Sequence, residues 1–400
     1  MVKHTIKSAQ AFSRRRLALY VGGFVAVGAA VVAVIFAAGP YVQLESETGT
    51  ISGNASVVSD AGASGGQALL LDAPSSGSCP VPKRTITTSD VSGNLNSGYP
   101  SGTQVYVPGG PDPWGGCFPS AANTGIPAGT SLTNYTGPCT ITAANTVIDS
   151  KNITCDITIT ATGVTIKNSK ITAYQLEVRQ TGSLTITDSE LIFASDVTTE
   201  GLFGYNYTAT RLNMRGGRRQ VYCEDTCTLQ DSYLHDQMDD PSGTAHESGV
   251  RVEQNTRLIH NTIWCNAPDR PPDGGCSADQ TGYADFAPIH DNTMDKNFYM
   301  AAAASAYCSY GGATSSKAYS GSPLNATNIH FTNNVFQRGT TPSFRTDIPL
   351  SDKRRYICGN YGSTTDFSSA KTGFQFTGNM WDDGFLFAND TTYTDWPFYN

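Results

Sequence analysis

Residues 164–171 read Val-Thr-Ile-Lys-Asn-Ser-Lys-Ile, and residues 184–191 read Leu-Thr-Ile-Thr-Asp-Ser-Glu-Leu. Alternate apolar residues are typical of a β-strand that buries one face. Each strand ends at a bend containing Asn or Asp, because these residues tolerate left-handed backbone and hydrogen-bond the local main chain. Variants of the same phrase recur at residues 228–234, 258–263, 289–294, 329–336 and 374–381. A recurring strand–bend–strand unit indicates a stacked array.

The repeated unit predicts an all-β chain folded as a right-handed parallel β-helix, a solenoid. One coil cannot bury its own apolar residues, so stacking must place the same position of successive coils in one apolar column. Stacked asparagines at the bends can form amide ladders. The alternative is a β-sandwich with Asn-rich turns, which is disfavoured because no Asn-Gly hairpin signal separates the copies. The residues expected in the inward columns are Ile148, Ile166, Ile186, Leu229, Ile259, Ile289, Phe331 and Phe376.

The N-terminal segment has the organisation of a membrane anchor. Residues 1–16 carry five Lys and Arg residues and no acidic residue, and residues 17–39 carry no charge. Roughly 20 apolar residues span a bilayer, and a basic flank stays cytoplasmic. We therefore expect a single-pass protein of the cell membrane with residues 1–16 in the cytoplasm and its C-terminal part extracellular. The alternative is a secreted protein, with a signal peptide cleaved near residues 37–39 (Ala-Ala-Gly).

The ten cysteines all lie beyond residue 78, and an even number in an oxidising compartment predicts disulfides. Close spacing suggests Cys223 with Cys227 and Cys265 with Cys276. The remaining expected pairs are Cys79 with Cys117, Cys139 with Cys155, and Cys308 with Cys358. Zinc at Cys223 and Cys227 is disfavoured because no second Cys/His pair has suitable spacing. The net charge of −8 argues against a nucleic-acid partner and against an acidic glycan held by bulk electrostatics.

Residues 40–78 are expected to form a linker or stalk. Within them, residues 43–71 resemble the opening of the β-sandwich carbohydrate-binding modules of families six and thirty-five. The matching points are Glu45, Glu47, residues 57–60 (Val-Val-Ser-Asp) and residues 63–66 (Ala-Ser-Gly-Gly). The match covers about thirty residues, whereas a β-sandwich needs on the order of 100, so it implies a fragment of such a module.

Residues 79–140 are rich in Pro, Gly, Ser and Thr. They include residues 108–114 (Pro-Gly-Gly-Pro-Asp-Pro-Trp), whose prolines and glycines predict a loop. We expect this segment to form an N-terminal cap over the open end of the stack, because an uncapped end would expose unpaired strand edges. Residues 141–400 would then contain the parallel β-helix and a C-terminal tail.

The repeats also resemble secreted bacterial β-helix proteins of the pectin-lyase-like superfamily. The resemblance extends from about residue 117 to residue 385. It is carried by residues 125–130 (Gly-Ile-Pro-Ala-Gly-Thr), 146–149 (Thr-Val-Ile-Asp), 163–169, 231–235, 285–289, 310–312, 334–339 and 381–384. It implies the fold and leaves the activity open, because one fold carries many functions.

Residues 234–251 concentrate two histidines, four carboxylates and an arginine. We expect them to form an inter-coil loop that lines an elongated groove. A lyase acting on uronic-acid glycans needs a cation for the sugar carboxylate, a base for the C5 proton and an acid for the leaving oxygen. The catalytic candidates are His235, His246, Arg251 and Asp240. The substrate-binding candidates are Arg215, Arg218, Arg219 and Glu247. The possible metal is Ca²⁺, with Asp236, Asp239 and Asp240 as ligands.

These candidates predict an extracytoplasmic protein that acts on or binds a polysaccharide or cell-surface glycan, with a polysaccharide lyase as the enzymatic form. The alternatives are a non-catalytic adhesin or glycan-binding protein, and a structural spacer. A glycoside hydrolase is less favoured. Asp239 and Asp240 are similar to the adjacent aspartates of polygalacturonases, but the Gly-His-Gly and Arg-Ile-Lys motifs are missing. In the spacer hypothesis the cluster is a solvated loop, and His260, His290 and His330 are outward-facing strand positions.

Overall fold

The structure is a computed structural model, and the chain divides into two compact units, Met1–Asp72 and Ala73–Asn400. The residues that it describes are 55–59, 67–71, 79–88, 99–283, 289–301, 308–313, 326–339, 349, 351, 356, 358, 373 and 375–387. Residues 17–39, the predicted anchor, lie outside this set. Across the described ranges no helix has the length and apolar character needed to span a membrane.

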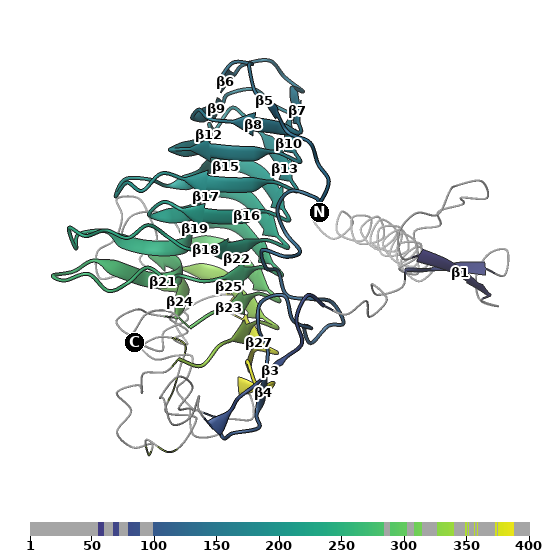
Figure 1. Ribbon diagram of the computed structural model, residues 1–400, viewed down its shortest axis with the longest axis vertical. Helices are drawn as coiled ribbons and strands as arrows, with labels where there is room; N and C mark the ends of the chain where they lie inside the picture. The colour runs from purple at the N-terminus through teal and green to yellow at the C-terminus, as the bar shows by residue number, and fades with distance from the viewer. Residues whose placement is uncertain are drawn as a thin grey trace, which may run out of the picture. The chain divides into compact units, whose positions relative to one another are not determined.

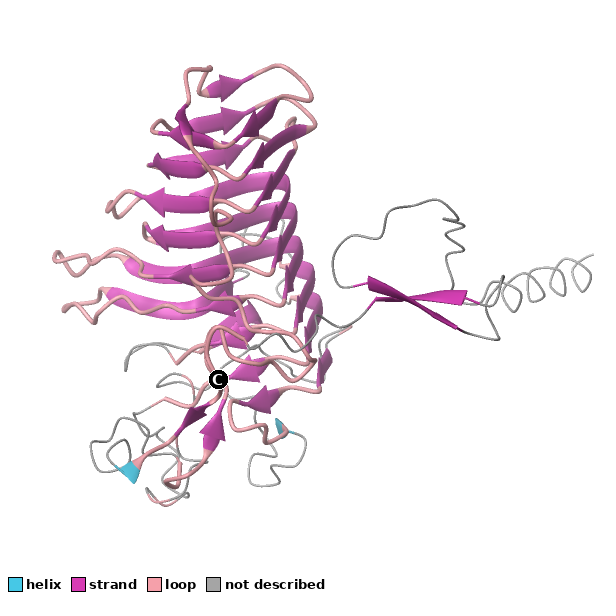
Figure 2. Ribbon diagram, turned by 45° about the vertical axis from the view of Figure 1, so that its right-hand side comes forward, coloured by secondary structure: helices cyan, strands magenta, loops and turns pink. Residues whose placement is uncertain are grey.

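In the first unit, β1 (Ala55–Ser59) and β2 (Gln67–Leu71) form an antiparallel pair. In the second unit, β3 (Arg84–Thr85) and β4 (Gln104–Val105) form another. The rest of the described second unit is dominated by two parallel sheets of 14 and 10 strands. Figure 1 and Figure 2 show the strands stacked one above another. The confirmed part of the fold prediction is therefore that the described residues are nearly all β and form parallel sheets.

The 14-stranded sheet has its strands at irregular intervals along the chain. They are β6 (Thr140–Ile141), β7 (Val147–Asp149), β9 (Ile157–Ile159), β10 (Val164–Lys167), β12 (Gln175–Val178), β13 (Leu184–Thr187), β15 (Gly201–Thr210), β17 (Arg219–Gln230), β19 (His246–Ile259), β21 (Gly275–Tyr283), β22 (His290–Asp295), β24 (Ser309–Ala313), β25 (Thr327–Thr332) and β27 (Gln375–Thr377). The long strands β15, β17 and β19 bend at Asn206, Thr226 and Asn255, each with positive φ. The first half of β15 pairs with β12 and its second half with β13.

Along the chain, the strands of the 10-stranded sheet are interspersed with those of the 14-stranded sheet. Its strands are β5 (Thr133–Asn134), β8 (Lys151–Ile153), β11 (Lys170–Ala173), β14 (Glu190–Phe193), β16 (Asn213–Gly216), β18 (Tyr233–His235), β20 (Thr262–Ile263), β23 (Phe298–Tyr299), β26 (Val335–Phe336) and β28 (Met380–Trp381). We call one passage of the chain through both sheets a coil. The apolar core lies between the sheets and is continuous from Ile141 to Trp381.

The main apolar column confirms most of the predicted inward residues. In register, it contains Ile148, Ile166, Ile186, Ala209, Leu229, Leu258, Met294, Phe331 and Phe376. The prediction was wrong at Ile259, which pairs with Gln230 and is only half-buried. Ile289 is buried in the core as predicted, but the residue of its coil that pairs with Leu258 in the main column is Met294. A shift of one residue reverses the face of a strand, and two adjacent apolar residues leave that shift undetermined.

Replacement of Leu258 by Ala is expected to lower the free energy of unfolding by about 3 kcal/mol, because it leaves a cavity in a fully buried column. The matched change Ile259→Ala should cost less than about 1 kcal/mol at its half-buried site. Urea unfolding of both variants measures the difference. Equal losses, or a larger loss for Ile259→Ala, would contradict the observed register.

The bends between the two sheets use left-handed backbone. The positive-φ residues there are Ser150, Asn168, Asp188, Arg211, Asp231, His260, Lys296, Asn333 and Gly378. The residue that follows each of the later bends is buried, and in four successive coils it is Asn261, Asn297, Asn334 and Asn379. Each amide nitrogen donates to the amide oxygen of the next asparagine at 3.0–3.1 Å as far as Asn379. The predicted amide ladder is confirmed.

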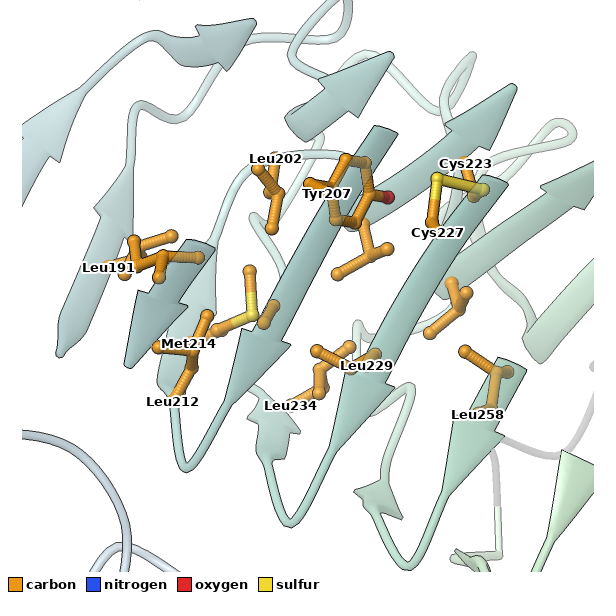
Figure 3. Packing of buried hydrophobic residues seen from close by; sticks show 14 of the residues in the cluster. Leu191, Leu202, Tyr207, Leu212, Met214, Cys223, Cys227, Leu229, Leu234 and Leu258 are labelled. Atoms are coloured by element: carbon orange, nitrogen blue, oxygen red, sulfur yellow. A yellow bond between two sulfur atoms is a disulfide. The ribbon is translucent and has the colours of Figure 1, made fainter. Parts of the chain in front are cut away.

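All five expected cysteine pairs are disulfides, and no described cysteine is free. Cys223 and Cys227 are bonded inside the core near Tyr207 (Figure 3). The zinc alternative at this pair is therefore wrong. Five disulfides are typical of a protein that folds in an oxidising, extracytoplasmic compartment.

Part of the segment predicted to cap an end of the stack, residues 79–140, lies along its side, whereas its strands β5 and β6 lie at an edge of the two sheets. We call residues 99–125 the strap. The main-chain N–H of Tyr106 donates to the carbonyl of Asp382 (2.8 Å), and that of Gly125 donates to the carbonyl of Arg211 (2.9 Å), so the strap runs from the last coils to the coil of β16 (Figure 1). Its Phe118 ring lies 4.7 Å from Phe298. The strap covers apolar side chains on the outer face of the 10-stranded sheet, which would otherwise be exposed.

His260 joins the strap to a coil. Its Nδ1 lies 2.6 Å from Oδ1 of Asp231 and its Nε2 lies 3.1 Å from Oδ2 of Asp112 in the strap. Burial lowers the pKa of His260, but hydrogen bonds to Asp112 and Asp231 outweigh it and raise the pKa to about 9. The imidazolium is therefore held between two carboxylates at neutral pH.

Because the folded pKa of His260 exceeds its unfolded value of about 6.5, its contribution to stability is complete below that value and is lost as pH rises through about 9. The contribution is on the order of 3 kcal/mol. The melting temperature of the wild type should therefore fall between pH 7 and pH 10 by more than that of His260→Gln. Parallel pH profiles for the two proteins would show that the pair of contacts does not hold the strap.

Candidate functional site

The predicted site residues are divided among three places. Arg215 and His235 are neighbours in register on the 10-stranded sheet. Nδ1 of His235 lies 2.7 Å from Oδ2 of Asp236 and its Nε2 lies 2.9 Å from Oδ1 of Asn213. Its ring stacks on Tyr233, and burial lowers its pKa. Both ring nitrogens thus have structural partners, which leaves His235 poorly suited to substrate chemistry.

The second place is the loop between β18 and β19, which is shorter than predicted because β19 already begins at His246. Asp240 accepts hydrogen bonds from Ser242, Thr244 and Ala245, and these hold its pKa far below the usual range. His246 is more than half exposed, faces Asp273 at 3.3 Å and lines a pocket with residues 269–277. Asp240 therefore orders its own loop.

The three aspartates predicted to bind Ca²⁺ have separate partners. Asp239 forms an ion pair with Arg270 (Nε to Oδ1, 2.6 Å), and Oδ1 of Asp236 accepts from Asn266 at 2.8 Å. The carboxylate of Asp240 is satisfied within its loop. Within the described ranges, no group of three or more His, Cys, Asp or Glu residues is arranged to hold a metal ion. These side chains do not fit a calcium site.

The third place is the outer face of the 14-stranded sheet, where Arg218, Arg219, Glu247 and Arg251 come together. Four neighbouring strands carry triplets there, at residues 177–179 (Glu-Val-Arg), 203–205 (Phe-Gly-Tyr), 222–224 (Tyr-Cys-Glu) and 251–253 (Arg-Val-Glu). Their first two residues are in register, and a shift after Gly204 pairs Tyr205 with Asp225. The middle residue of each triplet is buried in the core, except that one of them is a glycine. The residues on either side of it therefore face outward. We call these outward residues, with Arg218 and Arg219, the outer-face patch: Glu177, Arg179, Phe203, Tyr205, Arg218, Arg219, Tyr222, Glu224, Arg251 and Glu253.

Tyr222 is the centre of this patch. Its hydroxyl donates to Oε1 of Glu253, and its ring lies 5.2 Å from that of Phe203. The guanidinium carbons of Arg251 and Arg219 lie 5.2 and 5.9 Å from the Tyr222 ring centre. Nε of Arg251 is 3.8 Å from Oε1 of Glu253. A phenol, a carboxyl group and two cations therefore meet on one face.

Arg218 and Arg219 share one carboxylate. Both form ion pairs with Glu200, and Nε of Arg219 also donates to Oγ of Ser248 at 3.2 Å. Burial lowers the pKa of each arginine to about 10, and the positive charge of Arg251 adds to the effect. Both arginines remain cationic at neutral pH. The positive charges of the three arginines repel one another here, and an anionic ligand would relieve that repulsion.

The pKa is raised at two carboxyl groups of this region, Glu253 and Glu247. Burial raises the pKa of Glu253 to about 7, although Tyr222 and Arg251 partly offset it. Burial also raises the pKa of Glu247 to about 7, although the main-chain N–H groups of Glu247 and Gly275 partly offset it. The pKa of Tyr222 is raised well above the ordinary value, mainly by burial, so its hydroxyl stays protonated. A carboxyl group with a pKa near neutral and a protonated phenol therefore lie side by side.

The sequence interpretation missed the other residues of the patch, which are Glu177, Arg179, Phe203, Tyr205, Tyr222, Glu224 and Glu253. The signal that could have revealed them is the recurrence of a polar or aromatic residue on each side of a small or apolar one. Without the register between coils, however, the four triplets are separated by different lengths of chain and do not look aligned.

No protein-family model matches the chain, and no curated protein matches it. The resemblances to the pectin-lyase-like superfamily and to carbohydrate-binding modules therefore stay expectations that rest on the motifs quoted above.

Proposed function

We propose that the chain is an extracytoplasmic polysaccharide lyase, built as a right-handed parallel β-helix and held at the membrane by residues 17–39. Its site is the outer-face patch rather than the loop of residues 234–251. The observation that carries the proposal is the hydrogen-bonded pair of Tyr222 and Glu253, flanked by Arg219 and Arg251. The expected partner is an acidic polysaccharide that contains uronic acid.

The proposed reaction is β-elimination. Arg219 and Arg251 bind the uronic acid carboxylate and stabilise the negative charge that develops when C5 loses its proton. The Glu253 carboxylate takes that proton, the C4–O bond breaks, and the Tyr222 hydroxyl gives its proton to the leaving oxygen. The products are a saturated glycan end and an unsaturated sugar. Proton transfer from Glu253 to the Tyr222 phenolate, along their hydrogen bond, restores the site.

A non-catalytic glycan-binding protein is the second candidate, favoured by the aromatic rings of Phe203 and Tyr222 beside the arginines. Half-buried aromatic rings bind the apolar faces of sugars without any chemistry. An adhesin of this kind would use the same patch.

One experiment separates the two. The full-length protein is incubated with an array of acidic and neutral glycans, and retention and release of ultraviolet-absorbing unsaturated product are measured. Product from a uronic-acid glycan supports the lyase. Retention without product selects the binding protein, and neither retention nor product rejects both.

A further inference from the structure

We infer that Glu200 is a positioning residue of the proposed site. As an internal counter-ion it holds Arg218 and Arg219 together, and it thereby keeps Arg219 against the ring of Tyr222. The inference rests on the proposed function, because it adds a residue to the same site. It is carried by the two ion pairs of Glu200 and by the way the chain places this side chain beside the arginines.

The backbone on both sides of Glu200 is held against the start of β17. Before it, the carbonyl of Thr199 accepts from the main-chain N–H of Arg219 at 3.4 Å. After it, Gly201 has a positive φ of 63°, and a Cβ at this position would collide with the carbonyl oxygen of Gln220. Glycine allows this close approach because it has no side chain. The position of the Glu200 carboxylate is therefore set by the fold.

Both carboxylate oxygens of Glu200 face an arginine. Oε1 pairs with Nη2 of Arg218, and Oε2 pairs with Nη1 of Arg219. The side chains of Glu200 and Arg219 are only 16% and 11% exposed, so salt screens this pair less than a surface pair. Nε of Arg219 donates to Oγ of Ser248 at 3.2 Å, which gives the guanidinium a second anchor. Removal of the carboxylate would leave a largely buried cation without its partner.

The carboxylate of Glu200 also adjusts the charge beside the proposed base. Arg219 stands over the ring of Tyr222, whose hydroxyl donates to Glu253. The positive charges of Arg219 and Arg251 oppose each other. Glu200 offsets part of this positive charge. Without it the region becomes more positive, which favours the ionised form of Glu253.

The test uses full-length Glu200→Gln and Glu200→Asp, with an oligosaccharide of hexuronic acid as substrate, at a temperature where circular dichroism shows both variants folded. Glu200→Gln keeps the size of the side chain and removes its charge. Its kcat should fall about tenfold or more, since a misplaced group can cost up to about a hundredfold. The rise of its activity with pH should move below the wild-type value of about 7. Glu200→Asp keeps the charge and should retain the wild-type pH profile.

A second measurement tests the counter-ion without turnover. Glu200→Ala opens space between the two arginines, and its melting temperature should be lower than that of the wild type by about 5 °C. Sodium formate supplies a carboxylate of the right charge and should restore part of this loss. An equal concentration of sodium chloride should restore less. Glu190→Ala is the matched control, because its partners Arg215 and Lys170 are more exposed, and formate and chloride should act on it alike.

The outcomes separate this inference from the proposed function. If the wild type releases product and Glu200→Gln keeps its kcat and pH profile, the inference is overturned and the proposed function stands. Equal effects of formate and chloride on Glu200→Ala also overturn the inference. If the wild type releases no product from any acidic glycan, the proposed function fails, and the inference fails with it even where formate restores the melting temperature.

Discussion

Glu253→Gln is expected to lower the rate of unsaturated product formation by at least about a hundredfold, because a positioned general base contributes roughly 10²–10⁴ to a rate. Glutamine retains the size of the side chain and can still accept from the Tyr222 hydroxyl, but it cannot take the C5 proton. In the wild type, activity should rise with pH through about 7, since Glu253 must be ionised to act as the base. The variant should lose that rise.

Glu190→Gln is the matched control. Glu190 lies on the 10-stranded sheet, where it pairs with Arg215 (3.1 Å) and Lys170 (3.5 Å), away from the proposed site. Its product formation and pH profile should equal those of the wild type. Thermal unfolding of both variants shows that the fold is retained. If Glu253→Gln keeps full activity, or Glu190→Gln loses as much, Glu253 is not the base.

Asn297→Asp is expected to unfold the second unit. The Nδ2 of Asn297 donates to the carbonyl of Leu258 (2.8 Å) and to Oδ1 of Asn334 (3.1 Å), while its Oδ1 accepts from the amide of Asn261 (3.0 Å). Aspartate replaces the two donors by an oxygen that faces two other oxygens in a fully buried site. The cost is several kcal/mol, a large part of a typical stability of about 5–15 kcal/mol.

Circular dichroism during heating measures this effect, and Asn145→Asp is its control. Asn145 is exposed and has a positive φ that aspartate also tolerates. The control should melt within a few degrees of the wild type. A wild-type melting temperature for Asn297→Asp would show that the ladder does not stabilise the stack.

Local chemistry was enough to predict the strands, the bends, the amide ladder and the cysteine pairs. Alternation fixes which residues of a strand face inward, and bend residues such as Asn168 and Asn333 need left-handed backbone. The prediction from local chemistry failed where two neighbouring residues have the same chemistry. Leu258 and Ile259 are equally apolar, so the bend at His260 decides which of the two faces the core. Histidine is not a residue type that predicts a bend.

The candidate site could be predicted only in part. Arg218, Arg219, Glu247 and Arg251 were found because charged residues were dense near them. Tyr222 and Glu253 are 31 positions apart, and only the register of β17 and β19 brings their side chains together. The side position of the strap could not be predicted either, because its contacts, such as Asp112 with His260, span 148 positions.

The central claim is that the acidic glycan binds on the outer face of the 14-stranded sheet. The most direct test is a crystal structure of Glu253→Gln with a bound acidic oligosaccharide. We predict a sugar carboxylate within hydrogen-bonding distance of Arg251 or Arg219. An oligosaccharide bound instead at His235 and Asp236, or in the pocket beside His246, would contradict the account.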